Sequence, residues 1–301
     1  MDYSIIVVTH NARGHLEAGL ATLTERPVEV IVVDNASRDG TPEFVRETFP
    51  TVRLIELPEN VGFGEANNVG MEAASGSWFL LVNSDARPVD DAVERLVAFG
   101  DADPRLAVAG PRLVGTDGRV QKSVRGFPTL WRLATEYFFL RKLAPRSRVL
   151  NDFYGAGFAY DESREADFLM GAVLLVRRSA LEQVGGFDPA FFMFSEEVDL
   201  CYRMRQAGWK VVFTPDAEFV HLGGASTRPS WDRMYLEQLR GHLRFLAKHR
   251  GLEEAERARR LLVAALRLRA LVFRGERRRS SRAAAAWLAS GSAEALLESP
   301  G

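Results

Sequence analysis

The sequence has few of the features that mark secreted, membrane-spanning or nucleic-acid-binding proteins. Cys201 is its only cysteine, so no internal disulfide can form and a reducing compartment is favoured. No stretch approaches the roughly 20 consecutive apolar residues of a membrane-spanning helix, and the first residues enter a strand pattern without the basic segment of a signal peptide. A formal net charge of −1 creates no overall field that attracts nucleic acid. These absences predict a cytoplasmic globular protein that does not bind nucleic acid.

The amino-terminal third alternates strand patterns with helix patterns. Short apolar runs, rich in β-branched residues, occupy residues 3–8, 28–33, 52–57 and 78–82, and each is typical of a buried strand. The stretches between them carry apolar residues at helical spacing. This alternation predicts βαβ units and a mostly parallel sheet flanked by helices, which is an α/β fold.

The stretch SGSWFLLVNSDARPVD, residues 75–90, ends its apolar run abruptly at Asn83, Ser84 and Asp85. In open α/β sheets, ligands bind at the carboxyl ends of the central strands. Asp85 is therefore a candidate to hold a metal ion or a ligand. Taken alone, the same residue could simply cap the turn before Pro88, and both interpretations stay open.

A glycine loop at residues 60–64 follows the third strand pattern. Its sequence, GFGEANNVG from Gly62 on, lacks the G-x-G-x-x-G spacing of a dinucleotide fingerprint, and that fingerprint follows the first strand of its unit. The acidic residue that ends the second strand is Asp34. A Rossmann dehydrogenase is therefore a poor fit.

The second half carries three features with open interpretations. Residues 121–165 mix aromatics with arginines without a clear period, which suits a lid over a site or ordinary packing. Glu196 and Glu197 follow Ser195, a helix cap, and would complement the helix dipole even without a catalytic role. His221 ends a strand pattern in a glycine-rich loop, where a lone histidine is more often structural than a ligand.

Together the motifs resemble glycosyltransferase family 2, the nucleotide-sugar transferases of the GT-A fold. The resemblance covers about residues 3–225 and follows the order IIVVTHN, VIVVDNASRDGT, ENVGFGEANNVGMEAASGSWFLLVNSDA, DFLMGAVLLVRRSALEQVGGFDPAFFMFSEEVDLCYRMRQAGWKV and HLGGAS. It implies a catalytic domain over residues 1–230, with a Rossmann-like nucleotide-sugar half at 1–115 and an acceptor half at 116–230. Residues 231–301 would form a helical, basic carboxyl-terminal extension.

The resemblance also implies roles for individual residues. The nucleotide-sugar ligands would be Thr9, Asn11, Asp34, Asn35, Asn67, Ser84 and Asp85. Asp85 and His221 would bind the metal. Oxygen ligands and a diphosphate suit Mn²⁺ or Mg²⁺, and the imidazole of His221 favours Mn²⁺.

Two positions depart from the family pattern. Asn83 stands where the D-x-D element has its first aspartate. That element then supplies one carboxylate to the metal, so a second protein ligand such as His221 becomes more important for metal binding. Glu197 stands where the family has an aspartate as catalytic base, with Asp199 as the rival base. Asp199 and Arg203 are also spaced as an i,i+4 ion pair.

The implied activity is an inverting, metal-dependent sugar transfer that builds bacterial cell-surface polysaccharide. The subgroup resemblance favours a rhamnosyltransferase using dTDP-L-rhamnose and a saccharide or polyprenyl-linked acceptor, with UDP-hexoses as the next donors. A non-catalytic nucleotide-sugar-binding module is the rival of another class. A nucleotidyltransferase fits poorly, because residues 9–13 are neither glycine-rich nor lysine-containing.

The tail beyond residue 230 carries two helix patterns. Leu236, Leu239, Leu243 and Leu246 share one helix face. Between residues 257 and 282 arginines alternate with aliphatic residues around a single acid, Glu276. One interpretation is a basic amphipathic helix in peripheral contact with the cytoplasmic face of a membrane. The other is packing on the catalytic domain or on the second subunit of a homodimer.

Overall fold

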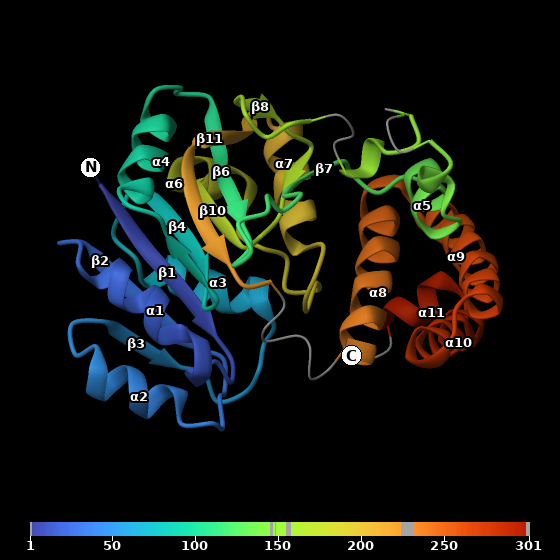
Figure 1. Cartoon of the computed structure of the whole chain (residues 1–301), viewed down its shortest axis with the longest axis horizontal. Helices are drawn as coiled ribbons and strands as arrows, with labels where there is room; N and C mark the ends of the chain where they lie inside the picture. Colours follow the sequence, from blue (N-terminus) through green and yellow to red (C-terminus); the bar gives the residue numbers. More distant parts are fainter. Residues whose placement is uncertain (1, 145–146, 148, 155–157, 224–230, 299–301) are drawn as a thin grey trace. The chain divides into compact units, whose positions relative to one another are not determined.

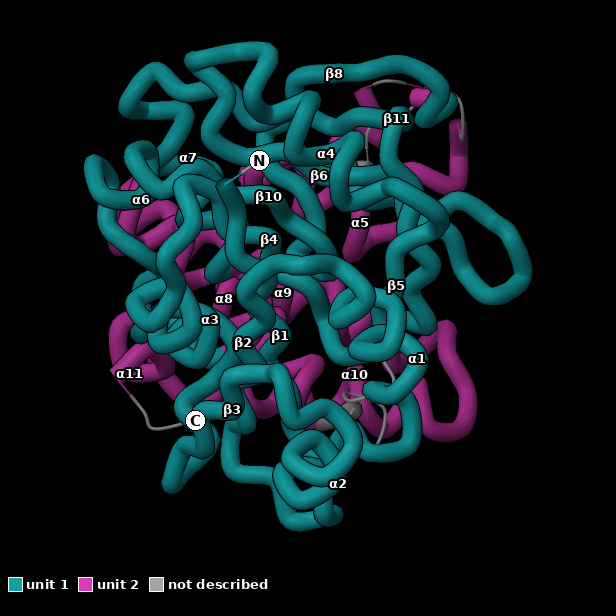
Figure 2. Tube along the Cα trace, turned by 90° about the vertical axis from the view of Figure 1, so that its left-hand side faces the viewer, with its two compact units in different colours: residues 1–124, 159–192, 196–229 teal, residues 125–158, 193–195, 230–301 magenta. Residues whose placement is uncertain are grey.

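The computed structural model describes residues 2–144, 147, 149–154, 158–223 and 231–298. The chain forms two compact units, shown in different colours in Figure 2. We call residues 1–124, 159–192 and 196–229 the sheet unit, and residues 125–158, 193–195 and 230–301 the helical unit. The helical unit thus includes residues 125–158, a stretch that the sequence analysis placed in the acceptor half.

The sheet unit is built on a nine-stranded sheet in the described residues, with the order β3-β2-β1-β4-β10-β6-β11-β5 and β8 paired with β11. The strands β7 (Val124–Arg125) and β9 (Phe168–Leu169) lie outside that sheet. The strands of the sheet are β1 (Tyr3–Thr9), β2 (Glu29–Asp34), β3 (Arg53–Glu56), β4 (Trp78–Asn83), β5 (Ala86–Pro88), β6 (Leu106–Val114), β8 (Arg164–Glu165), β10 (Val173–Arg177) and β11 (Lys210–His221).

The pairing confirms the predicted α/β class with a mostly parallel sheet. Strands β1, β2, β3 and β4 are mutually parallel, and β6 is parallel to β11. Strand β10 runs antiparallel between β4 and β6, and β5 runs antiparallel to β11. The sheet is therefore mixed at its centre and at the β5 end.

Helices cover both faces of this sheet (Figure 1). Leu16, Leu20 and Leu23 of α1 lie in one buried core with alternate strand residues such as Val7 and Val32, as the period-two geometry of strands requires. The helices of this unit are α1 (Arg13–Thr24), α2 (Thr41–Thr48), α3 (Phe63–Ala73), α4 (Ala92–Asp101), α6 (Arg178–Val184) and α7 (Glu196–Gln206).

Helix α3 packs on the opposite face through a glycine. A Cβ added at Gly70 would lie 2.5 Å from Cγ2 of Ile6 and 3.2 Å from Cγ2 of Val33, so only glycine lets this helix approach β1 and β2 so closely. The two faces together give a three-layer arrangement whose strand ends are free to build a site.

Three local features of the backbone stand out. Helix α4 begins at Ala92 with Asp91 in the cap position, and Asp90 before it has a φ of 50°. Strand β6 runs through Gly110 and Pro111, and Pro111 lies beside the register shift that follows Thr214 of β11. The lost N–H of a proline is tolerated at such irregularities. Ser195 lies directly before α7, in the predicted cap position, with a left-handed φ of 74° where a capping serine usually has extended backbone.

The helical unit packs around α9. This helix contacts α5, α8, α10 and α11. Leu239, Leu243 and Leu246 are buried along α8, which confirms the predicted apolar face. The elements are α5 (Leu130–Tyr137), η1 (Leu140–Lys142), η2 (Asp152–Tyr154), α8 (Trp231–Arg250), α9 (Leu252–Val272), α10 (Gly275–Ala289) and α11 (Ala293–Glu298).

Part of the unpatterned stretch is tied to α9 by one arginine. The guanidinium of Arg269 donates to the main-chain oxygens of Glu136 and Tyr137 at 2.8 Å each. It also lies over the rings of Tyr137 and Phe139, 4.7 and 4.8 Å from their centroids. Residues 136–139 therefore serve as packing, while residues 145–146, 148 and 155–157 of that stretch lie outside the described residues. No helix in the described part of the chain is both long and apolar enough to span a bilayer.

Candidate active site

The carboxyl ends of three parallel strands meet at one edge of the sheet. Thr9 at the end of β1 is in register with Asp34 at the end of β2, and Val8 is in register with Asn83 at the end of β4. The structure therefore brings together polar residues that the sequence places at three separate strand ends.

Asp34 and Thr9 carry buried polar atoms that have no hydrogen-bond partner within the described residues. One carboxylate oxygen of Asp34 accepts from the main-chain N–H of Ser37 at 2.9 Å. Its other oxygen, Oδ1, is buried and unsatisfied, and so is Oγ1 of Thr9. Burial raises the pKa of Asp34 in spite of the Ser37 hydrogen bonds. A ligand that brings an N–H or a hydroxyl to this point would remove a desolvation cost that the protein alone leaves in place.

The side-chain amide of Asn35 is hydrogen-bonded to the glycine loop. Its amide nitrogen donates to Oδ1 of Asn60 at 2.9 Å and to the main-chain oxygen of Gly62 at 3.1 Å, and its oxygen accepts from the N–H of Val61 at 2.9 Å. Both amide donors are thus used inside the protein. Asn35 shapes the loop beside the strand ends.

Gly62 fits where no other residue would. Its φ is 89°, and an added Cβ would lie 2.2 Å from the main-chain oxygen of Phe192. That same oxygen accepts from the N–H of Phe63 at 2.9 Å, at the start of α3. The loop is therefore pinned at both ends, by Asn35 and by Phe192.

The other predicted nucleotide ligands lie around these strand ends, and each already makes a polar contact within the protein. Asn11, with a φ of 51°, accepts from the N–H of Arg38 at 2.8 Å and so holds the loop after β2. Asn67 is buried in α3 and donates to the main-chain oxygen of Phe63 at 2.9 Å. Ser84 is buried, and its hydroxyl lies 3.4 Å from Nε2 of His15.

The structure places Asp85 against His221. Strand β5 pairs with the end of β11, with Ala86 opposite His221, and the N–H of Leu222 donates to the main-chain oxygen of Asp85 at 3.0 Å. Nε2 of His221 lies 3.3 Å from Oδ1 of Asp85, and both side chains are buried.

Gln121 fixes the protonation of that histidine ring. Its amide nitrogen donates to the main-chain oxygen of His221 at 2.8 Å, so its oxygen must be the atom that lies 2.8 Å from Nδ1 of the ring. That oxygen only accepts, so Nδ1 carries a proton, and in the neutral ring the Nε2 lone pair is the one directed toward Asp85. The sequence analysis missed Gln121, because its partner lies 100 residues further along the chain and no local pattern reports such a pairing.

This arrangement fits a divalent cation. A lone pair that faces a carboxylate oxygen is repulsive unless a proton or a metal cation lies between the two atoms. Two ligands about 2.1 Å from one octahedral ion lie about 3 Å apart, close to the separation of Nε2 and Oδ1. Within the described residues, no group of three or more His, Cys, Asp or Glu side chains could hold a metal.

Of the two candidate bases, Asp199 is fully occupied. It has no exposed surface, and its Oδ2 accepts from Nε of Arg203 at 2.7 Å. The same guanidinium donates to the main-chain oxygens of Val184 and Gly186. The guanidinium of Arg203 thus ties Asp199 of α7 to the turn after α6.

Glu197 is half-buried and lies beside the end of β4. A Cβ added at Gly171 would lie 3.8 Å from Cβ and Cγ of Glu197. The next residue, Ala172, accepts the N–H of Asn83 through its main-chain oxygen at 2.9 Å. The neighbouring Glu196 is buried, and desolvation, reinforced by the charge of Glu197, raises its pKa well above the usual value. Glu196 therefore holds its proton more readily than an exposed glutamate.

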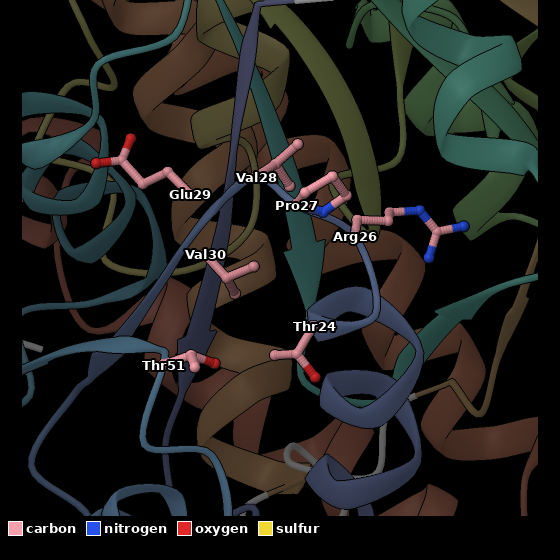
Figure 3. Close-up of a pocket in the computed structure, with 7 residues that line it drawn as sticks. All are labelled: Thr24, Arg26, Pro27, Val28, Glu29, Val30 and Thr51. Atoms are coloured by element: carbon pink, nitrogen blue, oxygen red, sulfur yellow. The ribbon is translucent and has the colours of Figure 1, made fainter.

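A separate cavity of about 410 Å³ lies at the amino end of β2 (Figure 3), lined by Thr24, Arg26, Pro27, Val28, Glu29, Val30 and Thr51. The two charged side chains there extend to opposite sides of Val28 in this view. Both are already engaged, Arg26 with Glu94 at 2.8 Å and Glu29 with the hydroxyl of Ser4 at 2.5 Å. This cavity lies at the wrong end of the strand for a ligand site of an open α/β sheet.

Known proteins are similar to this chain in sequence or in fold. An N-acetylglucosaminyl-diphospho-decaprenol L-rhamnosyltransferase of Mycobacterium tuberculosis is 36% identical over 237 residues, which cover 74% of this chain and 76% of the relative. The structure of GalNAc-T7 with UDP, GalNAc and Mn²⁺ matches with a TM-score of 0.58 and 17% identity over 81% of this chain and 48% of that one. The mannosyltransferase PcManGT of Pyrobaculum calidifontis with GDP-Man and Mn²⁺ matches with a TM-score of 0.55 and 21% identity over 98% and 78%.

These two structural likenesses show the fold, which is of the GT-A type. Residues 4–185 match the family model described as glycosyl transferase family 2. The match covers more than half of the chain, and the mycobacterial relative supports it independently. The protein is therefore a glycosyltransferase that belongs to family 2.

Proposed function

We propose that this glycosyltransferase moves L-rhamnose from dTDP-L-rhamnose to a lipid-linked saccharide, with inversion at the anomeric carbon. The observation that carries the proposal is the pair of Asp85 and His221 at the strand ends, with Glu197 beside the same edge. The name of the mycobacterial relative supports both the sugar and a prenyl-diphosphate acceptor. A UDP-hexose is the alternative donor.

The nucleoside would occupy the ends of β1 and β2. Oδ1 of Asp34 would accept a base N–H or a ribose hydroxyl, and Oγ1 of Thr9 would complete the same pocket. Asn11 and Asn35 would act mainly by holding the two loops that border it. Asn67 and Ser84 would line the path of the diphosphate.

Asp85 and His221 would hold Mn²⁺ or Mg²⁺. The carboxylate suits either ion, and the imidazole favours Mn²⁺; the Mn²⁺ in both structural neighbours is in accord with this choice. A bound divalent ion would offset the negative charge that develops on the leaving diphosphate. Asn83 brings a neutral buried oxygen to the same strand end where the family pattern has a carboxylate.

Glu197 would be the general base. It would accept the proton of the acceptor hydroxyl while that oxygen bonds to the anomeric carbon and the bond from this carbon to the diphosphate oxygen breaks on the opposite face. Asp199 is unsuited to this role because Arg203 already holds it in a buried ion pair. A single displacement of this kind inverts the anomeric configuration, and its cation-like transition state resembles that of glycoside hydrolysis.

A lipid-linked acceptor would place the enzyme at the cytoplasmic face of a membrane, in peripheral contact. Residues 1–230 would carry the chemistry, with a nucleotide-sugar half over residues 1–115 and an acceptor half over residues 116–230. The extension beyond residue 230 would then serve attachment or assembly.

Donor turnover tests the proposal. We expect Mn²⁺-dependent hydrolysis of dTDP-L-rhamnose above that of UDP-hexoses, and inverted product with a prenyl-diphosphate saccharide acceptor. Asp85→Ala should abolish turnover and weaken Mn²⁺-dependent binding of dTDP in calorimetry, whereas Asp117→Ala, in the exposed turn that follows β6, should change neither. Full activity of Asp85→Ala would remove the metal assignment, and a donor left intact under all conditions would favour a non-catalytic binding module.

A further inference from the structure

The corner between α9 and α10 exposes a surface that the catalytic proposal leaves without a role. We call it the arginine corner. It joins the last turn and a half of α9 to the first two turns of α10. Its residues are Arg267, Leu268, Leu271, Val272, Arg274, Arg277, Arg278, Arg279 and Arg282, all exposed.

Three aliphatic side chains of this corner face water. Leu271 is 77% exposed, Val272 61% and Leu268 39%. Other leucines of the same helix, such as Leu262 and Leu266, are fully buried. The packing interpretation of the tail therefore accounts for the buried leucines, whereas the three exposed residues form an apolar edge without a partner among the described residues.

The charge of the corner is mainly positive, with six arginines against one acid, Glu276. Arg257 and Arg260, at the start of α9, form ion pairs with Glu253 and Glu256. In the described part of the chain, by contrast, no acidic side chain lies within ion-pair distance of the six arginines of the corner. Glu276 is the single acid between residues 257 and 282. The corner thus combines uncompensated positive charge with exposed aliphatic surface.

A groove of about 370 Å³ lies within the helical unit at this corner. It is lined by Arg267, Ala270, Leu271, Arg282, Ala285 and Ala286. Three alanines and Leu271 make its lining largely apolar, and each of the two helices contributes one arginine. A guanidinium presents several donors in a plane, which suits phosphate oxygens.

We propose that the arginine corner binds the anionic surface of a lipid bilayer. Leu268, Leu271 and Val272 enter the boundary between headgroups and acyl chains, and the arginines contact lipid phosphates, one of which occupies the groove. Exposed aliphatic residues favour a bilayer over nucleic acid, which offers phosphates without an apolar layer. A second copy is disfavoured because two such corners would bring like charges together.

The proposal rests on the proposed function only in that a prenyl-linked acceptor would bring the enzyme to a membrane. Its test is co-sedimentation of the full-length protein with phosphatidylcholine vesicles, with and without phosphatidylglycerol. We expect binding only with phosphatidylglycerol, and weaker binding as added salt shortens the Debye length.

Paired substitutions locate the contact. Arg278→Gln with Arg282→Gln should lower vesicle binding roughly 25-fold, because each arginine near an anionic surface contributes about fivefold, or ~1 kcal/mol. The control, Arg257→Gln with Arg260→Gln, removes the same charge from the ion-paired start of α9 and should change binding little. Leu271→Ser with Val272→Ser should also weaken binding, and its exposed positions leave the fold intact by circular dichroism.

Several outcomes overturn the proposal. The first is that the full-length protein does not bind anionic vesicles at low salt, and the second is that the test and control pairs lose vesicle binding equally. The third is that duplex DNA at equal charge releases the protein from vesicles. The fourth is that the protein forms a dimer that only the Leu271 and Val272 substitutions dissociate. A transfer assay with a short, water-soluble acceptor separates this failure from that of the enzyme. Turnover without vesicle binding rejects the arginine corner alone, and vesicle binding without turnover rejects the proposed reaction alone.

Discussion

At the scale of the residue, Gln121 decides which nitrogen of His221 can bind a cation. It makes two hydrogen bonds to His221, one to Nδ1 of the ring and one to the main-chain oxygen. Gln121→Leu keeps the side-chain size but removes both hydrogen bonds, so the ring is free to turn and to change tautomer. We expect Mn²⁺ affinity in the presence of dTDP to fall about 10–100-fold, as for other residues that orient a metal ligand.

Electron paramagnetic resonance of free Mn²⁺ measures this affinity without turnover. The control is Gln183→Leu, the same change at an exposed glutamine of α6 that pairs with Trp209. If Gln121→Leu binds Mn²⁺ as tightly as the unchanged protein, Gln121 is only a structural link between the hairpin and β11. If the unchanged protein itself binds no Mn²⁺, the metal site fails and Gln121 is not at issue.

The two adjacent glutamates of α7 give a matched pair of substitutions. Glu197→Gln removes the proposed proton acceptor at constant size, and kcat should fall about 10²–10⁴-fold with little change in donor KM. Glu196→Gln resembles the protonated form that burial already favours at that position, so its kcat should stay near that of the unchanged enzyme. The reverse result, an inactive Glu196→Gln and an active Glu197→Gln, would reassign the base.

At the scale of the element, α8 holds the segment that leads into α7. Phe194 and Ser195 have left-handed φ values of 64° and 74°, which only firm surroundings maintain in non-glycine residues. A Cβ added at Gly241 of α8 would lie 2.7 Å from the main-chain oxygen of Phe194 and 2.7 Å from the hydroxyl of Ser195. Gly241 thus allows the close approach that holds this backbone.

Gly241→Ala should therefore lower the free energy of unfolding by about 1–3 kcal/mol, as overpacking does. It should also lower kcat, since Glu196 and Glu197 follow Ser195 directly in the chain. Gly14→Ala is the control: it lies in α1 with no atom within 4 Å of the added Cβ, and it should be neutral or slightly stabilising. Urea unfolding and steady-state kinetics of the two variants decide between these expectations.

The predicted elements succeed where the signal is local. Strands β1, β2 and β4 were predicted from short apolar runs, and α1 from apolar residues at helical spacing. Burial on both faces of a strand, or on one face of a helix, determines which neighbouring residues are apolar, so a short stretch of sequence is enough to detect it. The direction of β10 was not predicted, since it depends on how residues 116–172 return to the sheet. The pairing of β5 with β11 was missed for the same reason. Asp85 and His221 were predicted as ligands by resemblance, but their contact follows from that pairing.

At the scale of the whole molecule, stability should depend on one buried histidine of the helical unit. His242 is enclosed by the ring edges of Tyr137 and Phe153, and its Nδ1 has no hydrogen-bond partner within the described residues. Desolvation, with a smaller effect of Arg125, lowers its pKa from 6.5 to about 4. Between these two pH values His242 is protonated in the unfolded chain but not in the folded chain. Its contribution to the free energy of unfolding is therefore complete above the unfolded pKa and is lost as the pH falls below it.

The expected loss is about 3 kcal/mol on going from above pH 6.5 to near pH 4. His242→Phe should reduce this dependence, whereas His249→Gln, which removes a histidine from the same helix, should keep it. Urea unfolding followed by circular dichroism across that pH range makes the comparison. An unchanged slope in His242→Phe would mean that other groups, chiefly carboxylates, set the acid sensitivity.

The pairing of β5 with β11 also sets an order of events during synthesis. A ribosome releases β1, β2 and β4 early, so the strand ends that carry Thr9 and Asp34 can assemble on a nascent chain. Asp85 is made soon afterwards but meets His221 only when the last strand of the sheet emerges. With the roles proposed above, an unfinished chain would bind a nucleoside before it could hold the metal beside the diphosphate, so an incomplete enzyme would release no sugar.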